Sequence, residues 1–308
     1  MPTDEPTDPL ARFEAAVRTR LGDEADTWLA EVPDLIASTQ AAWDLMVTSP
    51  ARDSDAFGMT IPATRAGEKV LLRLMYPDGW FADETTALQA WDGNGAVRLL
   101  ESDPRGAHLR AAPDPGVSLV LERNRMRALR LAAGALRALW IPAPDGLQTL
   151  SAEVRTWMGQ MPARFDAAHR PFERQLLYDA QQLFRTFAPT QATPVLLHGD
   201  ARLAAFVTDG DHAVAIDPKP LVGEPAFDAA SLLRDGPQEL VADSAAGAQQ
   251  LQSRLEQLTD LLDVSPSRVK GWAFAVAVDT GLLAYEGGDA AGGDLMIHVA
   301  RLCQSLSA

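Results

Sequence analysis

The 308-residue sequence lacks several features on which whole classes of protein depend. Its single cysteine, Cys303, excludes an intrachain disulfide and a cysteine-based metal site. The five histidines show none of the spacings that metal-ligating histidines use. No apolar run approaches the roughly 20 residues of a membrane span, and the first residues lack the basic and apolar regions of a signal peptide. We therefore expect a cytoplasmic protein without membrane contact.

Basic residues are also scarce, since 27 Lys and Arg stand against 42 Asp and Glu, for a net charge of −15. Such a balance argues against nucleic acid and against anionic membrane surfaces, because phosphate backbones are bound by clustered basic side chains. A nucleotide can still bind where a metal ion and a few basic groups compensate its charge. With 47% hydrophobic residues the chain can bury a sizeable core. We expect a small-molecule partner, while the sequence leaves the oligomeric state open.

Three well-known site motifs are missing as well. The sequence has no G-x-x-x-x-G-K-[ST] phosphate loop, no G-x-G-x-x-G after a strand and no G-x-S-x-G nucleophile elbow. These absences argue against a P-loop nucleotidase, a dinucleotide-binding fold and an α/β-hydrolase.

The hydrophobic pattern predicts an α+β protein in two parts. The first, residues 1–112, begins with two helices, the second of which is expected to start at Pro33. A small, mostly antiparallel sheet with one inserted helix follows. Its strands are expected at residues 59–63, 70–75, 96–100 and 108–112, and its helix at 81–91. A stiff Pro-Asp-Pro-Gly connector then opens the second part, residues 113–308, which is mostly helical.

The residues from Pro194 to Asp228 contain the most informative pattern in the chain. Apolar runs at 195–197 and 213–216 lie next to Asp200 and Asp217, and an Asp-Gly-Asp turn lies between them. We expect a hairpin of these two runs that brings both carboxylates to one end. Paired carboxylates suit a divalent cation and proton abstraction. Solvated loop aspartates are commoner for any single Asp, but the pairing favours the functional interpretation.

A basic residue within a predicted strand is the second candidate. Arg73 is the only charge in the apolar run 70–75, and Glu84 on the following helix is a plausible partner that would hold it. Arg73 could fix phosphates in a phosphoryl-transfer site, where metal, base and cation are the main requirements. The competing interpretation is an exposed strand residue whose alkyl stem covers the sheet.

Three segments together are similar to the aminoglycoside/hydroxyurea antibiotic resistance kinases, the streptomycin 6-kinase branch of the aminoglycoside phosphotransferases. They are LLHGD at 196–200, AIDPKPLVGEPAFDAA at 215–230 and ALQAWDGNGAVRLLESD at 87–103. The resemblance implies a protein-kinase-like bilobal fold, with a small antiparallel-sheet N-lobe and a mostly helical C-lobe. It also implies ATP and Mg²⁺ as cofactors and phosphorylation of a small-molecule hydroxyl.

The resemblance further implies roles for individual residues. Asp200 matches the catalytic base, within the same motif as His198, and Asp217 matches the metal-binding aspartate. Asp228 matches the aspartate that braces the catalytic loop, and Glu84 the glutamate that orients the phosphate-binding lysine. The hinge beside the adenine would be residues 108–118, which include Leu109 and Arg110.

The chain departs from the family pattern at two of these positions. Ala205 stands where the family has a metal-binding asparagine, and Arg73 where it has the phosphate-binding lysine. A methyl group cannot coordinate a metal, and the planar guanidinium of arginine is a different donor from a compact ammonium. Two hypotheses follow: an ATP-dependent small-molecule kinase, or a catalytically degenerate relative that binds a ligand without phosphoryl transfer. Acidic residues of the second part could also rim a pocket for a polycationic acceptor, although a solvated acidic surface is the simpler explanation. They are Asp235, Glu239, Asp243, Asp279, Glu286 and Asp289.

Overall fold

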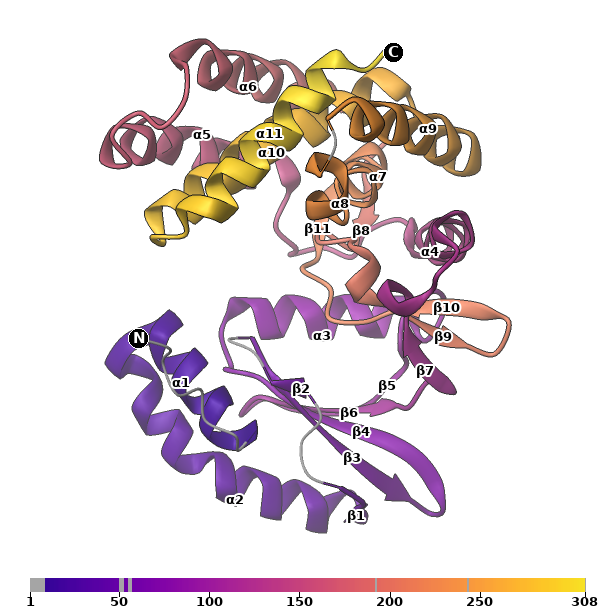
Figure 1. The fold of residues 1–308 in the computed structure, drawn as a ribbon. Helices are drawn as coiled ribbons and strands as arrows, with labels where there is room; N and C mark the ends of the chain where they lie inside the picture. The colour runs from indigo at the N-terminus through magenta and orange to yellow at the C-terminus, as the bar shows by residue number, and fades with distance from the viewer. Residues whose placement is uncertain (1–8, 50–52, 55–56, 192, 243, 308) are drawn as a thin grey trace. The chain divides into compact units, whose positions relative to one another are not determined.

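The computed structural model describes residues 9–49, 53–54, 57–191, 193–242 and 244–307. The chain divides into two compact units, Met1–Gly116 and Val117–Ala308, four residues beyond the boundary expected from the sequence. The first unit combines a sheet with three α-helices, and the second is mainly helical (Figure 1). The α+β class is therefore confirmed. Among the described residues, no helix combines the length and hydropathy that crossing a membrane requires.

The sheet of the first unit is antiparallel throughout its registered pairs, with the strand order β1-β3-β4-β6-β5 and β2 paired to β3. The strands are β1 (Leu45–Val47), β2 (Asp53–Ser54), β3 (Met59–Arg65), β4 (Glu68–Leu74), β5 (Leu99–Asp103) and β6 (Ala107–Ala111). β6 lies between β4 and β5, and the short strand β7 (Pro115–Ser118) follows it across the boundary of the two units. Arg73 of β4 is directly opposite His108 of β6 and Thr60 of β3, so these side chains share one face of the sheet.

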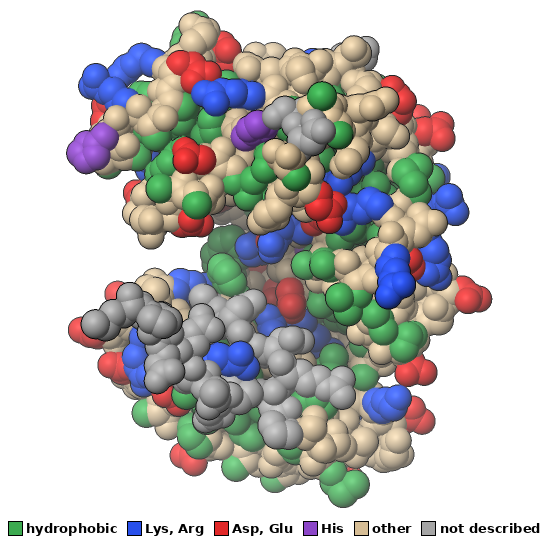
Figure 2. Space-filling view, in the orientation of Figure 1, with side chains coloured by type: hydrophobic (Ala, Val, Ile, Leu, Met, Phe, Trp, Pro, Cys, Tyr) green, Lys and Arg blue, Asp and Glu red, His purple; other side chains and the backbone are tan. Residues whose placement is uncertain are grey.

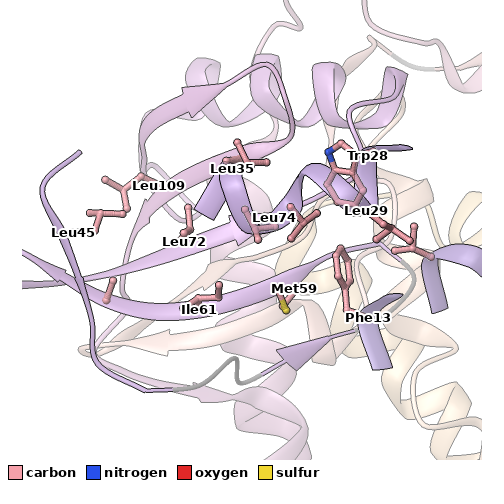
Figure 3. Packing of buried hydrophobic residues seen from close by; sticks show 14 of the residues in the cluster. Phe13, Trp28, Leu29, Leu35, Leu45, Met59, Ile61, Leu72, Leu74 and Leu109 are labelled. Carbon is pink, nitrogen blue, oxygen red and sulfur yellow. The ribbon is translucent and has the colours of Figure 1, made fainter. Parts of the chain in front are cut away.

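The opposite face of this sheet carries the hydrophobic core of the first unit (Figure 3). Leu72, Leu74 and Leu109 project from the central strands and are fully buried. Two helices cover them, α1 (Pro9–Leu21) and α2 (Asp26–Ala42), through Phe13, Trp28, Leu29 and Leu35. The alternation of apolar side chains along β4 and β6 is what places these leucines on one face.

Pro33 does not begin a helix, contrary to the expectation from the sequence. It lies inside α2, which starts at Asp26. The break between the first two helices falls earlier, at Gly22, whose φ of +62° ends α1. A short 3-10 turn, η1 (Gly22–Ala25), leads directly into α2.

The inserted helix α3 (Gly79–Trp91) begins at a well-formed cap. Asp78 accepts hydrogen bonds from the backbone N–H groups of Trp80 (3.0 Å) and Phe81 (3.2 Å). Glu84 is buried on the helix together with Phe81 and Leu88. The helix therefore brings a carboxylate onto the sheet rather than into solvent.

The second unit is built from eight α-helices in its described residues. These helices are α4 (Arg125–Leu139), α5 (Leu150–Ala167), α6 (Arg174–Phe187), α7 (Ala226–Leu233), α8 (Pro237–Val241), α9 (Ser244–Leu262), α10 (Pro266–Glu286) and α11 (Ala290–Ser305). Trp272 of α10 is fully buried and makes edge contacts with Phe187 and Phe227, with ring centroids 5.5 Å apart in both pairs. The α10 core thereby fixes α7, which carries Asp228. The tryptophan is a core residue.

Candidate active site

The residues from 195 to 223 form two small β-ladders instead of the single hairpin expected from the sequence. β9 (Phe206–Asp209) and β10 (His212–Ala215) are joined at the predicted turn, where Gly210 has a φ of +59°. β8 (Val195–Leu197), however, pairs with β11 (Leu221–Gly223). The expected pairing of 195–197 with 213–216 is therefore wrong, because the strand that returns to β8 comes after Asp217.

The two ladders nevertheless hold the loop of Asp200 against the loop of Asp217. The N–H of Lys219 donates to the carbonyl of His198 (2.8 Å), and the N–H of Ile216 donates to the carbonyl of Ala205 (2.8 Å). Both bonds join the segment after β8 to the segment after β10. The structure thus brings together the two loops that carry the predicted carboxylates.

Asp228 braces the first of these loops from α7. Its Oδ2 accepts from the backbone N–H of His198 (2.9 Å) and from Nε1 of Trp140 (3.1 Å), and its Oδ1 accepts from the N–H of Gly199 (2.9 Å). The carboxylate is completely buried. Burial raises the pKa of the Asp228 carboxyl, whereas the hydrogen bonds from Gly199, Trp140 and the backbone of His198 oppose the rise. The geometry is that of a structural brace, which is the role the resemblance implies for Asp228.

His198 links the two loops through its side chain. The imidazole is 0% exposed, so burial lowers its pKa and favours the neutral form. Its Nδ1 accepts from the N–H of Asp200 (3.3 Å), and its Nε2 lies 3.1 Å from the carbonyl oxygen of Ile216, to which the neutral ring donates. The sequence prediction placed His198 among the catalytic residues; in the structure its buried ring contacts the backbone of Asp200 and of Ile216 and thereby joins the two loops.

Backbone conformation at Gly199 explains why the motif contains a glycine. Gly199 has a φ of +82°, and a Cβ there would lie 1.8 Å from the carbonyl oxygen of Lys219. Only glycine lets the two loops approach this closely. Asp217 also adopts a positive φ, of 50°, a region that aspartate tolerates better than most residues.

Two cations hold the carboxylate of Asp200. Arg202 donates from Nε to Oδ1 (2.9 Å) and from Nη2 to Oδ2 (3.0 Å), while Nζ of Lys219 lies 3.0 Å from Oδ2. Burial alone would raise the pKa of Asp200, but attraction to Lys219 and Arg202 outweighs it and lowers the value to about 2. The side chain of Arg202 is 59% exposed and that of Lys219 is 31% exposed, so solvent reaches both cations.

The donor groups present fit one magnesium ion delivered with a nucleotide. Asp217 supplies a carboxylate, Asp200 is already bound by cations, and Ala205 offers a buried methyl group. Within the described part of the chain, no cluster of three or more His, Cys, Asp or Glu side chains could hold a metal by itself. Mg²⁺ commonly binds through one or two carboxylates together with phosphate oxygens and water. The set is therefore adequate for one phosphate-bound ion, and Ala205 adds no donor for a second.

In the first unit, the guanidinium of Arg73 lies close to a glycine. Nη1 of Arg73 donates to Oγ1 of Thr60 (3.1 Å), and a Cβ at Gly58 would stand 2.7 Å from Cζ of Arg73. Arg73 is 3% exposed, which excludes the interpretation of a solvent-exposed strand residue. Gly58 leaves the space that the planar guanidinium occupies.

Glu84 forms a buried ion pair with Arg110, an interaction that the sequence analysis did not anticipate. Their side chains are 2% and 4% exposed. The expected pairing of Glu84 with Arg73 stays a prediction. Leu109, between His108 and Arg110, points into the hydrophobic core. Because β6 lies between β4 and β5, the backbone groups of Leu109 and Arg110 belong to the sheet, and the adenine contact expected at these two residues finds no support here.

His108, also on β6, makes further contacts with α3. The ring of His108 is stacked on Phe81 with centroids 4.4 Å apart, and its Nε2 lies 2.8 Å from Oγ1 of Thr85. His108 is fully buried. One turn of α3 therefore meets alternate residues of β6, and the position of Glu84 follows from that contact.

The acidic residues proposed as a rim for a polycationic ligand are largely engaged within the second unit. Arg125 pairs with Asp235 (3.1 Å) and Glu239 (3.5 Å). Arg164 pairs in the same way with Asp279 (3.5 Å) and Glu286 (2.9 Å).

The two remaining acidic residues of the expected rim are Asp289 and Asp243. Asp289 caps α11 by accepting from the N–H of Gly292, and Asp243 lies outside the described residues. On the face shown in Figure 2, acidic and basic side chains are interspersed rather than gathered into one acidic patch. A solvated, arginine-paired surface therefore accounts for the described members of the rim.

Sequence reasoning missed Trp140 as part of the site, and it missed the pairing of Arg110 with Glu84, although it had placed Arg110 in the expected hinge. Trp140 lies 88 positions from the carboxylate it binds, and Arg110 lies 26 positions from its partner. Neither contact carried a signal in the sequence, because both depend on how distant elements pack.

This combination of a small antiparallel sheet, a mostly helical unit and a braced His-Gly-Asp loop defines a protein with the protein-kinase-like fold. Solved structures agree. A ternary complex of an aminoglycoside phosphotransferase with AMP-PNP and hygromycin B superposes with a TM-score of 0.61 at 15% identity, over 89% of this chain and 98% of that one.

Sequence comparisons identify the family within this class. Residues 48–288 match the aminoglycoside/hydroxyurea antibiotic resistance kinases, and the chain belongs to that family. It is 29% identical to a streptomycin 6-kinase of Streptomyces glaucescens, over 92% of each chain. It is also 32% identical to a hydroxyurea phosphotransferase of Kitasatospora aureofaciens, over 89% of this chain and 80% of that protein.

Proposed function

We propose that this protein is an ATP-dependent phosphotransferase that phosphorylates a hydroxyl group of a small molecule. The observation that carries the proposal is the hydrogen-bonded scaffold that presents Asp200 and Asp217 from adjoining loops, with Asp228 and His198 as its braces. Membership of a kinase family supports the reaction class. The acceptors named for the relatives, streptomycin and hydroxyurea, are the first candidates to test.

In this proposal Asp200 accepts the proton of the acceptor hydroxyl. The acceptor oxygen forms its bond to the γ-phosphorus while the bond between that phosphorus and the bridging oxygen breaks, and ADP leaves with the electron pair. For this step the bidentate contact of Arg202 with Asp200 must open. Because Arg202 is mostly exposed, solvent can replace its hydrogen bonds. The pKa of about 2 belongs to Asp200 with both cations in contact, so opening of the Arg202 contact also makes the carboxylate a stronger base.

The remaining roles follow the chemistry of each side chain. Asp217 would hold Mg²⁺, which supplies positive charge against the phosphates when bound. Arg73 would be the cation for the phosphate oxygens, with Glu84 and Arg110 fixing the helix and strand around it.

Replacement of the base tests the assignment. Asp200→Asn keeps the size of the side chain and removes the proton acceptor. The rate at which the phosphorylated acceptor forms should therefore fall about 10²–10⁴-fold. Asp211→Asn makes the same chemical change at an exposed residue of the β9–β10 turn and should leave turnover unchanged. Coupled measurement of ADP release and phosphorylated product reads both variants. A near-normal rate in Asp200→Asn would refute the role of this residue.

A second candidate function is nucleotide or ligand binding without phosphoryl transfer. It is favoured by the two cations bound to Asp200 and by the methyl group at Ala205. Calorimetric titration of AMP-PNP with and without Mg²⁺, followed by turnover assays, separates the two candidates. Activity that appears only after Ala205→Asn and Arg73→Lys would identify a degenerate kinase, whereas turnover by the natural chain would exclude degeneracy.

A further inference from the structure

Helix α7 has a carboxylate at each of its ends, and both contact the loop of Asp200. Asp228 lies in the first turn of the helix and accepts from two backbone N–H groups that precede Asp200. Asp235 follows the C-cap of the helix, and its Oδ1 accepts from the backbone N–H of Leu203, after Asp200 (3.1 Å). The proposed reaction does not use Asp235 directly, so its contact with this loop must serve another purpose.

The residue that Asp235 holds begins a short 3-10 turn, η4 (Leu203–Ala205). Leu203 is fully buried, and the N–H groups at the start of such a turn need acceptors from outside it. A side chain at the N-cap position commonly supplies one, but here that position is Arg202, whose guanidinium has no acceptor atom. Asp235 supplies the acceptor from 32 positions further along the chain.

Two arginines fix the orientation of Asp235. Nη2 of Arg125, on α4, lies 3.1 Å from Oδ2 and also donates to the backbone carbonyl of Asp235 (3.0 Å). Nη1 of Arg254, on α9, donates to the same carbonyl (2.6 Å). The side chain of Asp235 is largely buried, and each of its oxygens has a partner, Leu203 for Oδ1 and Arg125 for Oδ2. The carboxylate is thus presented to η4 in a fixed orientation.

The turn η4 is connected in its own right to the loop of Asp217. The carbonyl of Ala205, the last residue of η4, accepts from the N–H of Ile216 (2.8 Å), and Ile216 directly precedes Asp217. The N–H of Ala205 closes the turn on the carbonyl of Arg202 (2.8 Å). A short chain of hydrogen bonds therefore leads from Asp235 through η4 to the residue expected to hold Mg²⁺.

A purely structural role for Asp235 would be to hold α7 against α4 and α9. The contacts of Arg125 and Arg254 with the backbone carbonyl already do this, and any residue at position 235 would present that carbonyl. The side chain adds the bond to Leu203 and a second contact with Arg125. An aspartate at this position therefore matters more for η4 than for the packing of the helices.

We propose that Asp235 is a positioning residue for Asp217 and acts through η4, an inference that rests on the function proposed above. The part of the loop that precedes Asp200 is held separately by Asp228. Loss of the Asp235 carboxylate should therefore loosen η4 and the backbone before Asp217, and leave the backbone before Asp200 in place. Because Ala205 offers no ligand to a metal, it cannot compensate for a displaced Asp217.

Amide hydrogen exchange in the ligand-free chain tests this connection without an assay of activity. In Asp235→Ala the N–H of Ile216, two hydrogen bonds away from the substituted side chain, should exchange about tenfold faster, because the segment that holds it is loosened. Asp235→Asn keeps an oxygen that can accept from Leu203 and should restore most of the protection. Glu239→Ala is the matched control, since it removes a carboxylate from the same two arginines and leaves the bond to Leu203 in place. It should leave exchange at Ile216 unchanged.

Two results of this experiment would overturn the proposal. One is unchanged exchange at Ile216 in a folded Asp235→Ala variant. The other is an equal acceleration throughout α10, because it would show a general loss of stability of the second unit. If Asp235→Ala does not fold, Arg125→Gln replaces it with the same criteria, since Arg125 is only partly buried and orients the same carboxylate.

Nucleotide binding separates this proposal from the proposed kinase function. In calorimetric titrations of AMP-PNP, Asp235→Ala should raise the Mg²⁺ concentration for half-maximal binding about tenfold, as expected when the support of a metal ligand is lost. Affinity for AMP-PNP without Mg²⁺ should stay unchanged, and Glu239→Ala should match the natural chain in both measurements. An unaltered Mg²⁺ requirement in Asp235→Ala would overturn the role toward Asp217. Failure of the natural chain to bind AMP-PNP would count against the kinase and leave the exchange result valid.

Discussion

The carboxylate of Asp200 shows how two neighbouring cations outweigh the cost of burial. Arg202 and Lys219 lower its pKa to about 2, so the group stays ionised across the physiological range. An ionised carboxylate can accept a hydrogen bond from an acceptor hydroxyl throughout that range. Arg202 and Lys219 also occupy the carboxylate oxygens of Asp200 that the proposed reaction would use. In that proposal, activity requires Arg202 to move away.

Replacement of Arg202 should change the pH dependence of the reaction. In the natural chain the acid limb of kcat/KM that belongs to Asp200 should lie below about pH 4, since the pKa is well under that value. Arg202→Gln removes one source of attraction, and the limb should move to higher pH. Profiles of kcat/KM between pH 4 and 8, where the acid limb enters the accessible range, would show the shift. A limb at the same pH in both proteins would contradict the electrostatic account.

At Asp279 the effect of burial on the pKa exceeds the effect of the neighbouring cation. Asp279 is 4% exposed on α10, and burial raises its pKa to about 6 although Arg164 opposes the rise. The folded state therefore binds the proton more tightly than the unfolded state. The stability that this proton contributes is present below about pH 4 and is lost as the pH rises through 6.

Asp279→Asn should remove this pH dependence. Relative to the variant, the natural chain should lose about 2–3 kcal/mol of unfolding free energy between pH 4 and pH 7, from a shift of about two pKa units. The asparagine chain should consequently be the more stable of the two at neutral pH. Denaturant unfolding at several pH values measures the difference. Parallel stability curves for the two chains would contradict the prediction.

At the scale of elements, α3 is attached to the sheet through β6. Phe81, Glu84 and Thr85 meet His108 and Arg110, so one helical turn contacts alternate strand residues. These contacts hold α3 to a central strand of the sheet. The glutamate expected to orient a cation on β4 is thus also part of the attachment of the helix.

A double-mutant cycle can measure this attachment. Glu84→Gln should cost about 3–5 kcal/mol of unfolding free energy, because it leaves the buried Arg110 uncompensated. Glu84→Gln with Arg110→Met should cost clearly less than the sum of the single changes. The exposed pair of Glu101 with Arg65 in the same unit is the control, and Glu101→Gln should cost about 1 kcal/mol or less. Additive single changes at the buried pair would refute the coupling.

Over the whole molecule, many acidic residues are paired with arginines. Only three of the 27 basic residues are lysines. Arginines such as Arg125, Arg164 and Arg254 each bind more than one acceptor, which the forked guanidinium permits. A net charge of −15 is therefore compatible with local sites that are cationic, and Asp200 lies in one of them.

Nucleotide binding should stabilise the whole chain in a metal-dependent way. A ligand at about 100 times its Kd adds about 2.7 kcal/mol to the unfolding free energy if it binds only the folded state. We expect this increase with ATP and Mg²⁺, and a much smaller one with ATP and a chelator. Asp217→Asn should remove most of the difference, whereas Asp211→Asn should keep it. Denaturant or thermal unfolding provides the measurement, and equal stabilisation with and without metal would contradict the role of Asp217.

The fold class, the turn at Gly210 and the positions of the two aspartates could all be predicted from the amino-acid sequence. These depend on local patterns: apolar alternation, turn residues and the spacing of His-Gly-Asp from Ile-Asp-Pro-Lys. The same local patterns could not predict which distant segment a strand pairs with. The prediction paired β8 with the wrong strand, and it placed Pro33 at a helix start.

Which side chains contact one another depends instead on how the elements pack. Asp228 accepts a hydrogen bond from Trp140, and Glu84 forms an ion pair with Arg110. His198 is buried between two loops. In each case strand register and helix packing bring together residues that are far apart in the chain. Periodicity carries no information about such partners, since many arginines and tryptophans fit the same pattern. The charge around Asp200 is a result of the same kind: the sequence shows an acidic protein, and the fold surrounds its proposed base with arginine and lysine.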